Sequence, residues 1–110
     1  MGFSTVMEDY PFDDPDTTAM RHIGNRKIFA LILHHGGQLM VNIKHDPMMG
    51  EMWRSSFPAV IPGYHMNKLH WSSIILDGSV PDEVIAMMLE HSFDLTKPKQ
   101  KHRQQRLPKE

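Results

Sequence analysis

The sequence predicts a small α+β domain, in which a twisted antiparallel sheet carries its helices on one face. Strand-like runs separated by short turn signals between residues 17 and 44 predict three antiparallel strands in succession. The pair Asp46-Pro47 and an amphipathic run beginning at Val84 predict two helices. A chain of 110 residues holds one hydrophobic core and is too short to divide convincingly into two.

The first half of this domain reads as two successive hairpins. Residues 17–23 alternate loosely, residues 24–25 (Gly-Asn) offer a turn, and residues 27–33 are rich in the apolar side chains of strands. Residues 34–37 (His-His-Gly-Gly) tolerate positive φ, and residues 38–44 return with apolar side chains on alternate positions. We therefore expect a three-stranded meander.

The first helix should begin at Asp46-Pro47, because an aspartate accepts hydrogen bonds at the N-cap and proline fits the first helical position. This helix should end before Pro58. Its buried face is expected to hold Met48, Met49, Met52 and Trp53. Flexible thioethers at helical spacing usually fill a core, and Met87 and Met88 are interpreted in the same way.

In the second half, prolines and a glycine at residues 58–63 interrupt regular secondary structure. A strand over 70–76 and a closing helix are expected after them. Asp77-Gly78 should end the strand, and Ser79 with Asp82 three residues later resembles a capping box. The helix that follows has its apolar face at Val84, Ile85, Met88, Leu89 and Ser92.

The charges are sorted along the chain although the net charge is only −1. Residues 1–16 hold five acids and no base, and they are interpreted as an acidic, irregular segment ahead of the domain at 17–96. Residues 97–110 hold six bases and one acid. This basic tail is either a solvated C-terminus or a contact for phosphates. The near-neutral total argues against a strongly basic nucleic-acid binder.

Several classes of protein are not supported by the sequence. There is no cysteine, so disulfides and thiolate chemistry are excluded, and the eight histidines do not follow the spacings of metal motifs. No catalytic triad signature and no phosphate-binding glycine loop is visible. We therefore expect no enzyme activity, no cofactor and no metal. The longest apolar run, 28–33, is far shorter than the roughly 20 residues that cross a membrane, and the cytoplasm is the expected location.

The segment 62–71, with the sequence PGYHMNKLHW, has the highest density of hydrogen-bonding and aromatic side chains. Such side chains suit phosphate and base contacts, with Lys68 as the favoured contact. The structural alternative is that Trp71 opens the next strand and buries its ring. In that case His65, Asn67 and His70 satisfy backbone groups of the loop.

Five ordered motifs together resemble the YjbR/MmcQ family of small bacterial proteins. They are EDYPFDD at 8–14, VNIKHDP at 41–47, PGYHMNKLHW at 62–71, LDGSVPDE at 76–83 and HSFDL at 91–95. The resemblance implies a CyaY-like, double-wing fold whose β-hairpin wings contact DNA. Members of this family open with a helix, for which the seven residues before Glu8 leave no room, so the N-terminal helix is expected to be missing.

The expected function is therefore non-enzymatic, weak and salt-sensitive DNA binding. The candidate contacts are Asn25, Arg26, Lys27, Lys44, His65, Asn67, Lys68 and His70. The alternative is a protein-interaction or small-ligand module, with an apolar patch or a pocket beside Tyr64, His65 and Trp71. Without the first helix, apolar side chains of the 28–33 strand should be bare. A homodimer would cover them, with a folded-back C-terminal segment as the second possibility.

Overall fold

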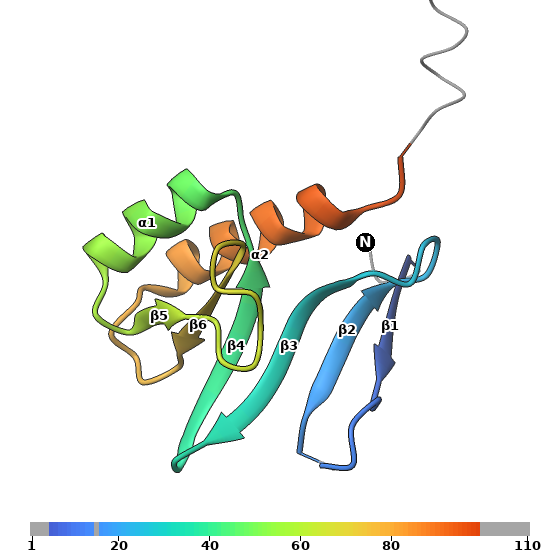
Figure 1. Ribbon diagram of the computed structural model, residues 1–110, viewed down its shortest axis with the longest axis horizontal. Helices are drawn as coiled ribbons and strands as arrows, with labels where there is room; N and C mark the ends of the chain where they lie inside the picture. Colours follow the sequence, from blue (N-terminus) through green and yellow to red (C-terminus); the bar gives the residue numbers. More distant parts are fainter. Residues whose placement is uncertain (1–4, 15, 100–110) are drawn as a thin grey trace, which may run out of the picture.

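The computed structural model describes residues 5–14 and 16–99, which form a six-stranded antiparallel sheet and two helices (Figure 1). The strand order across the sheet is β1-β2-β3-β4-β6-β5. The elements are β1 (Val6–Asp9), β2 (Thr18–His22), β3 (Ile28–His35), β4 (Gln38–Lys44), α1 (Pro47–Ser56), β5 (Val60–Pro62), β6 (Trp71–Ile75) and α2 (Asp82–Thr96). The predicted α+β class is confirmed.

Both predicted hairpins are present. His35 pairs with Gln38, so β3 and β4 are joined by a two-residue turn. Its residues Gly36 and Gly37 have φ values of 59° and 78°, as a type I′ turn requires, and glycine adopts such angles without steric cost. The β2–β3 turn places Arg26 at a φ of 63°, in the left-handed region that few side chains favour.

The acidic N-terminal segment is not irregular throughout, because Val6–Asp9 form β1. This strand pairs antiparallel with β2, from Val6 opposite His22, and Arg21 Nε donates to Asp9 Oδ2 at 2.7 Å. The prediction that ordered structure begins near Thr17 is therefore wrong. β1 depends on pairing partners that are ten or more residues away in the sequence, and four residues of mixed polarity give no strand pattern of their own.

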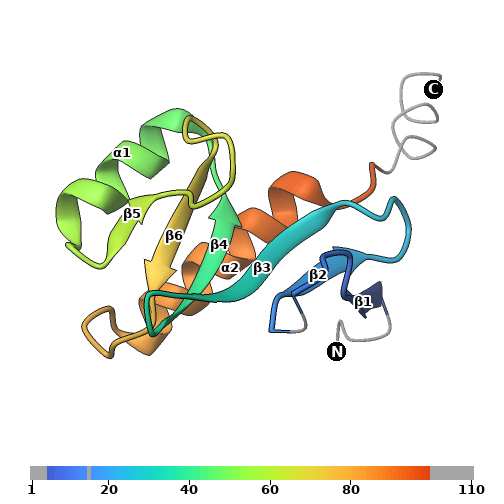
Figure 2. The ribbon, with the colours of Figure 1, turned by 60° about the horizontal axis from the view of Figure 1, so that its bottom comes forward.

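The two helices pack on the same face of the sheet, as predicted (Figure 2). Trp53 of α1 and Met88 of α2 meet Ala30, Ile43 and Ile74 of the central strands in one buried cluster. The loop between β5 and β6 lies over part of the opposite face (Figure 1). Its apolar cluster consists of Ala19, Leu31, Leu33 and Met40, with Tyr64 and Met66 of the loop packed against them.

Helix α1 begins as predicted, since Asp46 Oδ1 accepts the Met49 N–H at 2.8 Å. Its methionine face was predicted wrongly: Met48 and Met52 are 78% and 51% exposed. The buried positions are instead Trp53 and Gly50, and a Cβ at Gly50 would overlap the His45 ring. The close approach of that ring turns the helix so that two of its methionines face solvent.

Helix α2 buries the predicted face, with Met88 and Ser92 fully buried. The predicted capping box is wrong. Both the N–H and the hydroxyl of Ser79 donate to Asp77 Oδ1, at 2.9 and 2.7 Å, so the serine stabilises the turn after β6. The helix starts three residues later with Pro81 at the N-cap and no side-chain cap.

Ser92 inserts its hydroxyl between two strands. The β3–β4 ladder ends where Ala30 pairs with Ile43, and one residue beyond it the Lys44 N–H donates to Ser92 Oγ at 2.8 Å. The same hydroxyl donates to the Phe29 carbonyl at 2.6 Å. One helix side chain thus completes the hydrogen bonding of both strands, which satisfies groups that are costly to bury unpaired.

Two histidines are buried with a fixed hydrogen-bond pattern. His45 Nδ1 lies 2.9 Å from the Asp46 carbonyl and Nε2 lies 2.8 Å from Ser72 Oγ, which also accepts from Arg54. His22 Nε2 lies 2.8 Å from Thr96 Oγ1. Burial lowers the pKa of both imidazoles, so both are neutral near pH 7.

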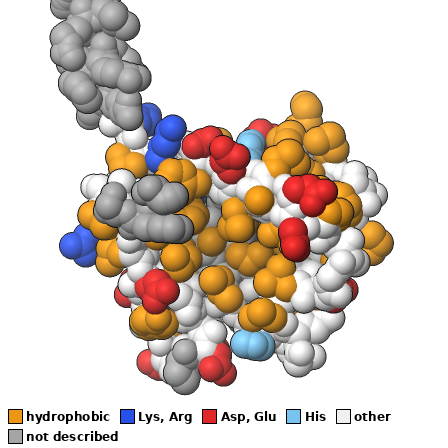
Figure 3. Space-filling view, turned by 180° about the vertical axis from the view of Figure 1, so that it is seen from behind, with side chains coloured by type: hydrophobic (Ala, Val, Ile, Leu, Met, Phe, Trp, Pro, Cys, Tyr) orange, Lys and Arg blue, Asp and Glu red, His pale blue; other side chains and the backbone are white. Residues whose placement is uncertain are grey.

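The helical face of the sheet is not covered over its whole width. Beside α2 lies an apolar groove of about 370 Å³, and hydrophobic side chains gather in the middle of this face (Figure 3). Its lining includes Met20, Ile32, Leu39, Val41, Leu76, Ile85 and Leu89. The expected absence of an N-terminal helix concerns a segment whose residues 1–4 lie outside the described residues. Of the 28–33 strand, where a bare apolar surface was expected, the half-buried Ile32 lines this groove, whereas Ala30 is buried in the core.

We expect Ser92→Ala to lower the free energy of unfolding by about 2–4 kcal/mol, because a buried N–H and a buried carbonyl each lose their partner. Urea denaturation measures the change. Ser55→Ala is the matched control, since Ser55 is an exposed helix serine bonded to the Glu51 carbonyl, and its effect should stay within about 0.5 kcal/mol. Equal effects of the two substitutions would contradict the role of the Ser92 hydroxyl.

The buried histidines predict a pH-dependent stability. As the pH falls below 6.5, the ordinary histidine pKa, the unfolded chain takes up protons that the folded protein excludes, so the melting temperature should drop. Thermal denaturation over a pH series measures this. The double variant His22→Gln/His45→Gln should show a flatter dependence than the unsubstituted protein, whereas exposed His34→Gln should not. A melting temperature that stays constant down to about pH 5 would refute the account.

Because the apolar groove beside α2 is open, we still predict that the protein self-associates. Sedimentation velocity at several concentrations should show a dimer in equilibrium with the monomer. Leu39→Glu, at a groove position that is 38% exposed, should shift this equilibrium to the monomer. Leu69→Glu, on the opposite face, should have no effect. A strictly monomeric particle at every concentration would rule out the dimer.

Candidate functional site

The loop between β5 and β6 is anchored by buried polar groups of the sheet. The Gly63 N–H donates to the Trp71 carbonyl at 3.0 Å, and a Cβ at Gly63 would lie only 2.9 Å from that oxygen. The Tyr64 N–H donates to Ser73 Oγ, and Asn42 Nδ2 donates to the Tyr64 carbonyl, both at 2.9 Å. Asn42 and Ser73 are fully buried. These two polar side chains are buried in central strands because they form hydrogen bonds with the backbone of the loop.

Two predicted contact residues form bonds inside this loop. Lys68 Nζ donates to the Gly63 carbonyl at 2.9 Å and lies 3.5 Å from the Met66 carbonyl. Asn67 Oδ1 accepts the Leu69 N–H at 2.9 Å. Both side chains remain exposed. The lysine that the sequence favoured as a phosphate contact therefore has a structural role in closing the loop, and its contact role stays a prediction.

The two predicted histidines lie at opposite ends of the loop. The Tyr64 ring stacks on His35 with a centroid distance of 4.0 Å, and His65 lies equally close to Tyr64, which places His65 toward the β3–β4 turn. The carbonyl of His70 accepts the His45 N–H at 2.9 Å, at the end of β4. These histidines do not form one patch.

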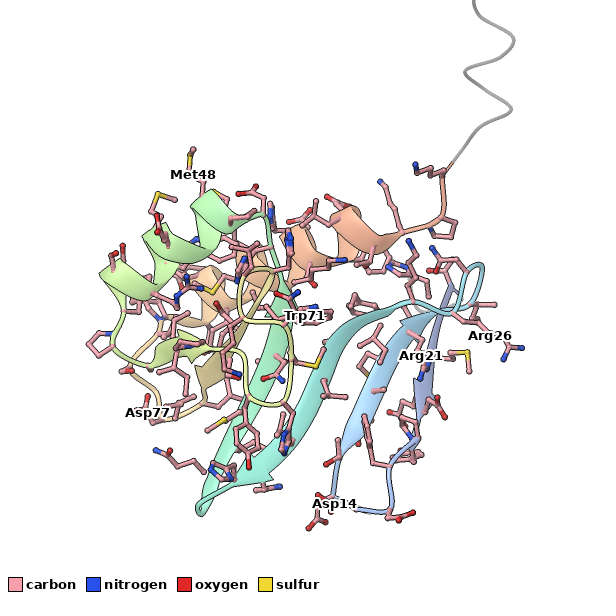
Figure 4. The ribbon with its side chains drawn as sticks, viewed as in Figure 1. Asp14, Arg21, Arg26, Met48, Trp71 and Asp77 are labelled. Atoms are coloured by element: carbon pink, nitrogen blue, oxygen red, sulfur yellow. The ribbon has the colours of Figure 1, made fainter. Side chains whose placement is uncertain are left out.

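The predicted turn residues Asn25, Arg26 and Lys27 lie between β2 and β3. Asn25 serves the turn itself: its Oδ1 accepts the Lys27 N–H, and its Nδ2 donates to the carbonyl of Thr96, the last residue of α2, at 2.9 Å. The side chains of Arg26 and Lys27 are exposed. Figure 4 shows Arg26 pointing away from the sheet at the end of this turn.

Three elements bring cations to one end of the sheet, which we name the cationic end. The β2–β3 turn is bonded to the end of α2 through Asn25 and Thr96, and the end of β4 is bonded to α2 through Lys44 and Ser92. The segment after α2 packs against the turn, because a Cβ at Gly24 would lie 2.7 Å from Pro98 Cγ. The cations of this end are Arg26, Lys27, Lys44, Lys97 and Lys99.

These five cations are largely free of acidic partners. Within the described part of the chain, the only ion pair among them joins Lys97 Nζ to Asp94 Oδ1, at 3.6 Å, and both of those side chains are at least half exposed. Sequence reasoning assigned Lys97 and Lys99 to a separate tail. That the segment carrying them packs against the β2–β3 turn through Pro98 was missed, because this packing depends on where α2 ends in space, which no local pattern indicates.

Six of the twelve acids in the described residues gather at the other end, in the β1–β2 and β6–α2 connections and in the first turn of α2. They are Asp13, Asp14, Asp16, Asp77, Asp82 and Glu83. Hydrogen bonds from the Asp16 N–H and the Thr17 hydroxyl lower the pKa of Asp14, and bonds from Ser79 lower that of Asp77. Figure 4 shows Asp14 and Arg26 at opposite ends of β2. Residues 5–14 and 16–99 hold 8 Lys and Arg against 12 Asp and Glu, a net charge of −4.

The described residues offer little for catalysis. No group of three His, Asp or Glu side chains there could hold a metal ion. The hydrogen-bonded pair of Ser72 and His45 resembles the serine and histidine of a catalytic triad. Both side chains are fully buried, so a substrate cannot reach them. No helix in this part of the chain has the length and apolar character that membrane crossing demands.

Solved structures with the same fold come from two bacteria. A crystal structure of a Pseudomonas syringae protein aligns with a TM-score of 0.75 and 29% identity, over 83% of this chain and 86% of that one. A Deinococcus radiodurans protein described as a DUF419 domain aligns with a TM-score of 0.74 and 35% identity, over 83% and 67% of the two chains.

Sequence comparisons agree with these structures. The uncharacterized Bacillus subtilis protein YyaQ is 35% identical over 100 residues, which cover 81% of this chain and 84% of that protein. The uncharacterized Escherichia coli protein YjbR is 35% identical over 66 residues, or 60% of this chain and 56% of that protein. The family model named YjbR matches residues 1–95. The chain therefore belongs to the YjbR family.

Proposed function

We propose that this protein is a non-enzymatic DNA-binding protein of the cytoplasm that contacts the phosphate backbone through its cationic end. The observation that carries the proposal is the convergence of five cations from three elements, four of them without an ion pair in the described residues. Exposed lysine and arginine side chains at one end of a domain attract phosphates and release the counterions bound to them.

The acidic end determines how the protein is oriented on the nucleic acid in the proposed complex. Phosphates are repelled by the carboxylates of the β1–β2 and β6–α2 connections, so the strands should point their cationic ends at the nucleic acid. Only a few cations are available, and the protein carries a net negative charge. The affinity should therefore be weak and strongly dependent on salt.

In this proposal the wings of a CyaY-like, double-wing fold are the hairpins of the sheet, with the β2–β3 turn as the foremost contact. Arg26 and Lys27 bind phosphates, and Asn25 holds the turn in place. Lys44, His70 and the C-terminal lysines extend this contact. Lys68, Asn67 and His65 lie on the loop over the other face and form a secondary contact.

Titration of a labelled DNA duplex tests the proposal. We expect micromolar binding at low salt, with log K falling against log[salt] at a slope of about −3 to −4 for four phosphate contacts. Arg26→Glu/Lys27→Glu should weaken binding at least roughly tenfold and lower the slope by about two. Lys68→Glu is the matched comparison at the loop and should have a smaller effect. Absence of binding to duplex and to single-stranded DNA alike, at high micromolar protein in low salt, would refute the proposal.

A second candidate function is a protein-interaction or small-ligand module, and the apolar groove beside α2 favours it. This function needs no phosphate contact. It predicts a partner that co-purifies after nuclease treatment, together with no duplex binding and no effect of the Arg26→Glu/Lys27→Glu substitutions. Loss of the partner on nuclease treatment would exclude it.

A further inference from the structure

A pocket of about 360 Å³ opens in the cationic end. Its volume lies in the lower part of the range of small-molecule sites, roughly 300–1,000 Å³. The lining residues used below are His22, Ile23, Phe93, Lys97, Pro98 and Lys99. They come from the β2–β3 turn, from the last turns of α2 and from the segment that follows it.

The pocket walls are apolar and held in place from behind. The Phe93 ring packs against the ring of His22, with a centroid distance of 4.4 Å, and His22 is bonded to Thr96. Ile23 is half exposed, and its N–H donates to the Thr5 carbonyl at 2.8 Å. Burial keeps the His22 ring neutral, so the back wall carries no charge. Such walls suit a flat, uncharged ring.

The mouth of the pocket is cationic. Lys97 and Lys99 belong to its lining, which contains no carboxylate, and the nearest acidic partner among the described residues is Asp94, whose Oδ1 lies 3.6 Å from Lys97 Nζ outside the lining. Arg26 and Lys27 extend the same charge along the adjoining turn. A ligand that fits this arrangement has an apolar aromatic body and phosphates on either side of it, which is the chemistry of a nucleotide within a strand.

We propose that this pocket accepts one unpaired nucleobase, with the flanking phosphates on Lys97 and Lys99, so that single-stranded nucleic acid is preferred over duplex. The inference rests on the proposed function and deepens it. A base within a duplex is stacked and paired, and must be extruded at a cost before it can enter a pocket. A base of a single strand is free to insert against aromatic and apolar side chains.

Fluorescence anisotropy with a labelled 12-nucleotide DNA strand and with its duplex, at one salt concentration, tests the inference. We expect the single strand to bind at least fivefold more tightly. Ile23→Ser should reduce the affinity for the single strand several-fold and leave that for the duplex unchanged. Met87→Ser is the matched control, since Ile23 and Met87 are both 50% exposed, and it should change neither. Circular dichroism verifies that both variants fold.

The possible results separate the two proposals. If neither DNA form binds, the proposed function and this inference fail together. If the duplex binds as tightly as the single strand and Ile23→Ser affects both equally, the inference fails and the proposed function stands. Deoxyadenosine monophosphate provides a third arm: displacement of the strand at millimolar concentration supports the pocket, whereas affinity equal to that of the strand indicates a free-nucleotide site and overturns the inference.

Discussion

The Ser92 hydroxyl between β3 and β4 fixes the position of the long helix on the sheet. It accepts from Lys44 and donates to Phe29, and one turn later Thr96 reaches His22 and Asn25. Because the helix is tied to two places at the same end of the sheet, its C-terminus must lie beside the β2–β3 turn. The pocket and the convergence of the cations both depend on this alignment.

An antiparallel meander places successive connections alternately at two ends of a sheet, and in this chain the connections at one end are mainly acidic and those at the other mainly basic, although Asp46 and Asp94 also lie at the cationic end. Acidic residues fill the β1–β2 and β6–α2 connections, and basic residues fill the β2–β3 turn and the chain after α2. Water and salt screen charges beyond about 8 Å at physiological ionic strength. The field at the cationic end is therefore set by the lysines and arginines near it, and a negative net charge does not cancel it.

The sequence predicts those features that depend on neighbouring residues. A turn was predicted over residues 34–37 and lies at Gly36-Gly37, with His34 and His35 still in β3, and Asp46-Pro47 specify a helix start. Both signals act within a few residues. β1 and the three-residue strand β5 were missed, since each exists only through its pairing with a strand formed elsewhere in the chain. Met48 was assigned to the core because periodicity cannot show that the His45 ring sets the rotation of the helix.

In the candidate site, too, the sequence indicated some residues, and only the structure shows which of them lie together. Arg26 and Lys27 were recognisable as turn residues between two strands, and the structure places them with Lys97 and Lys99 through the contacts of α2. Lys68 was favoured because it stands in a dense polar motif, yet its ammonium bonds to the Gly63 carbonyl. A sequence pattern identifies polar side chains and does not say whether the chain's own carbonyls already engage them.

The most direct test of this account is a map of backbone amide chemical shifts during titration of the isotope-labelled protein with DNA. The account predicts that the largest changes fall on residues 22–27, on Lys44 and on 93–99, and that the acidic connections stay unchanged. Changes confined to the loop at 63–70 or to the acidic end, or no changes at millimolar DNA, would contradict it.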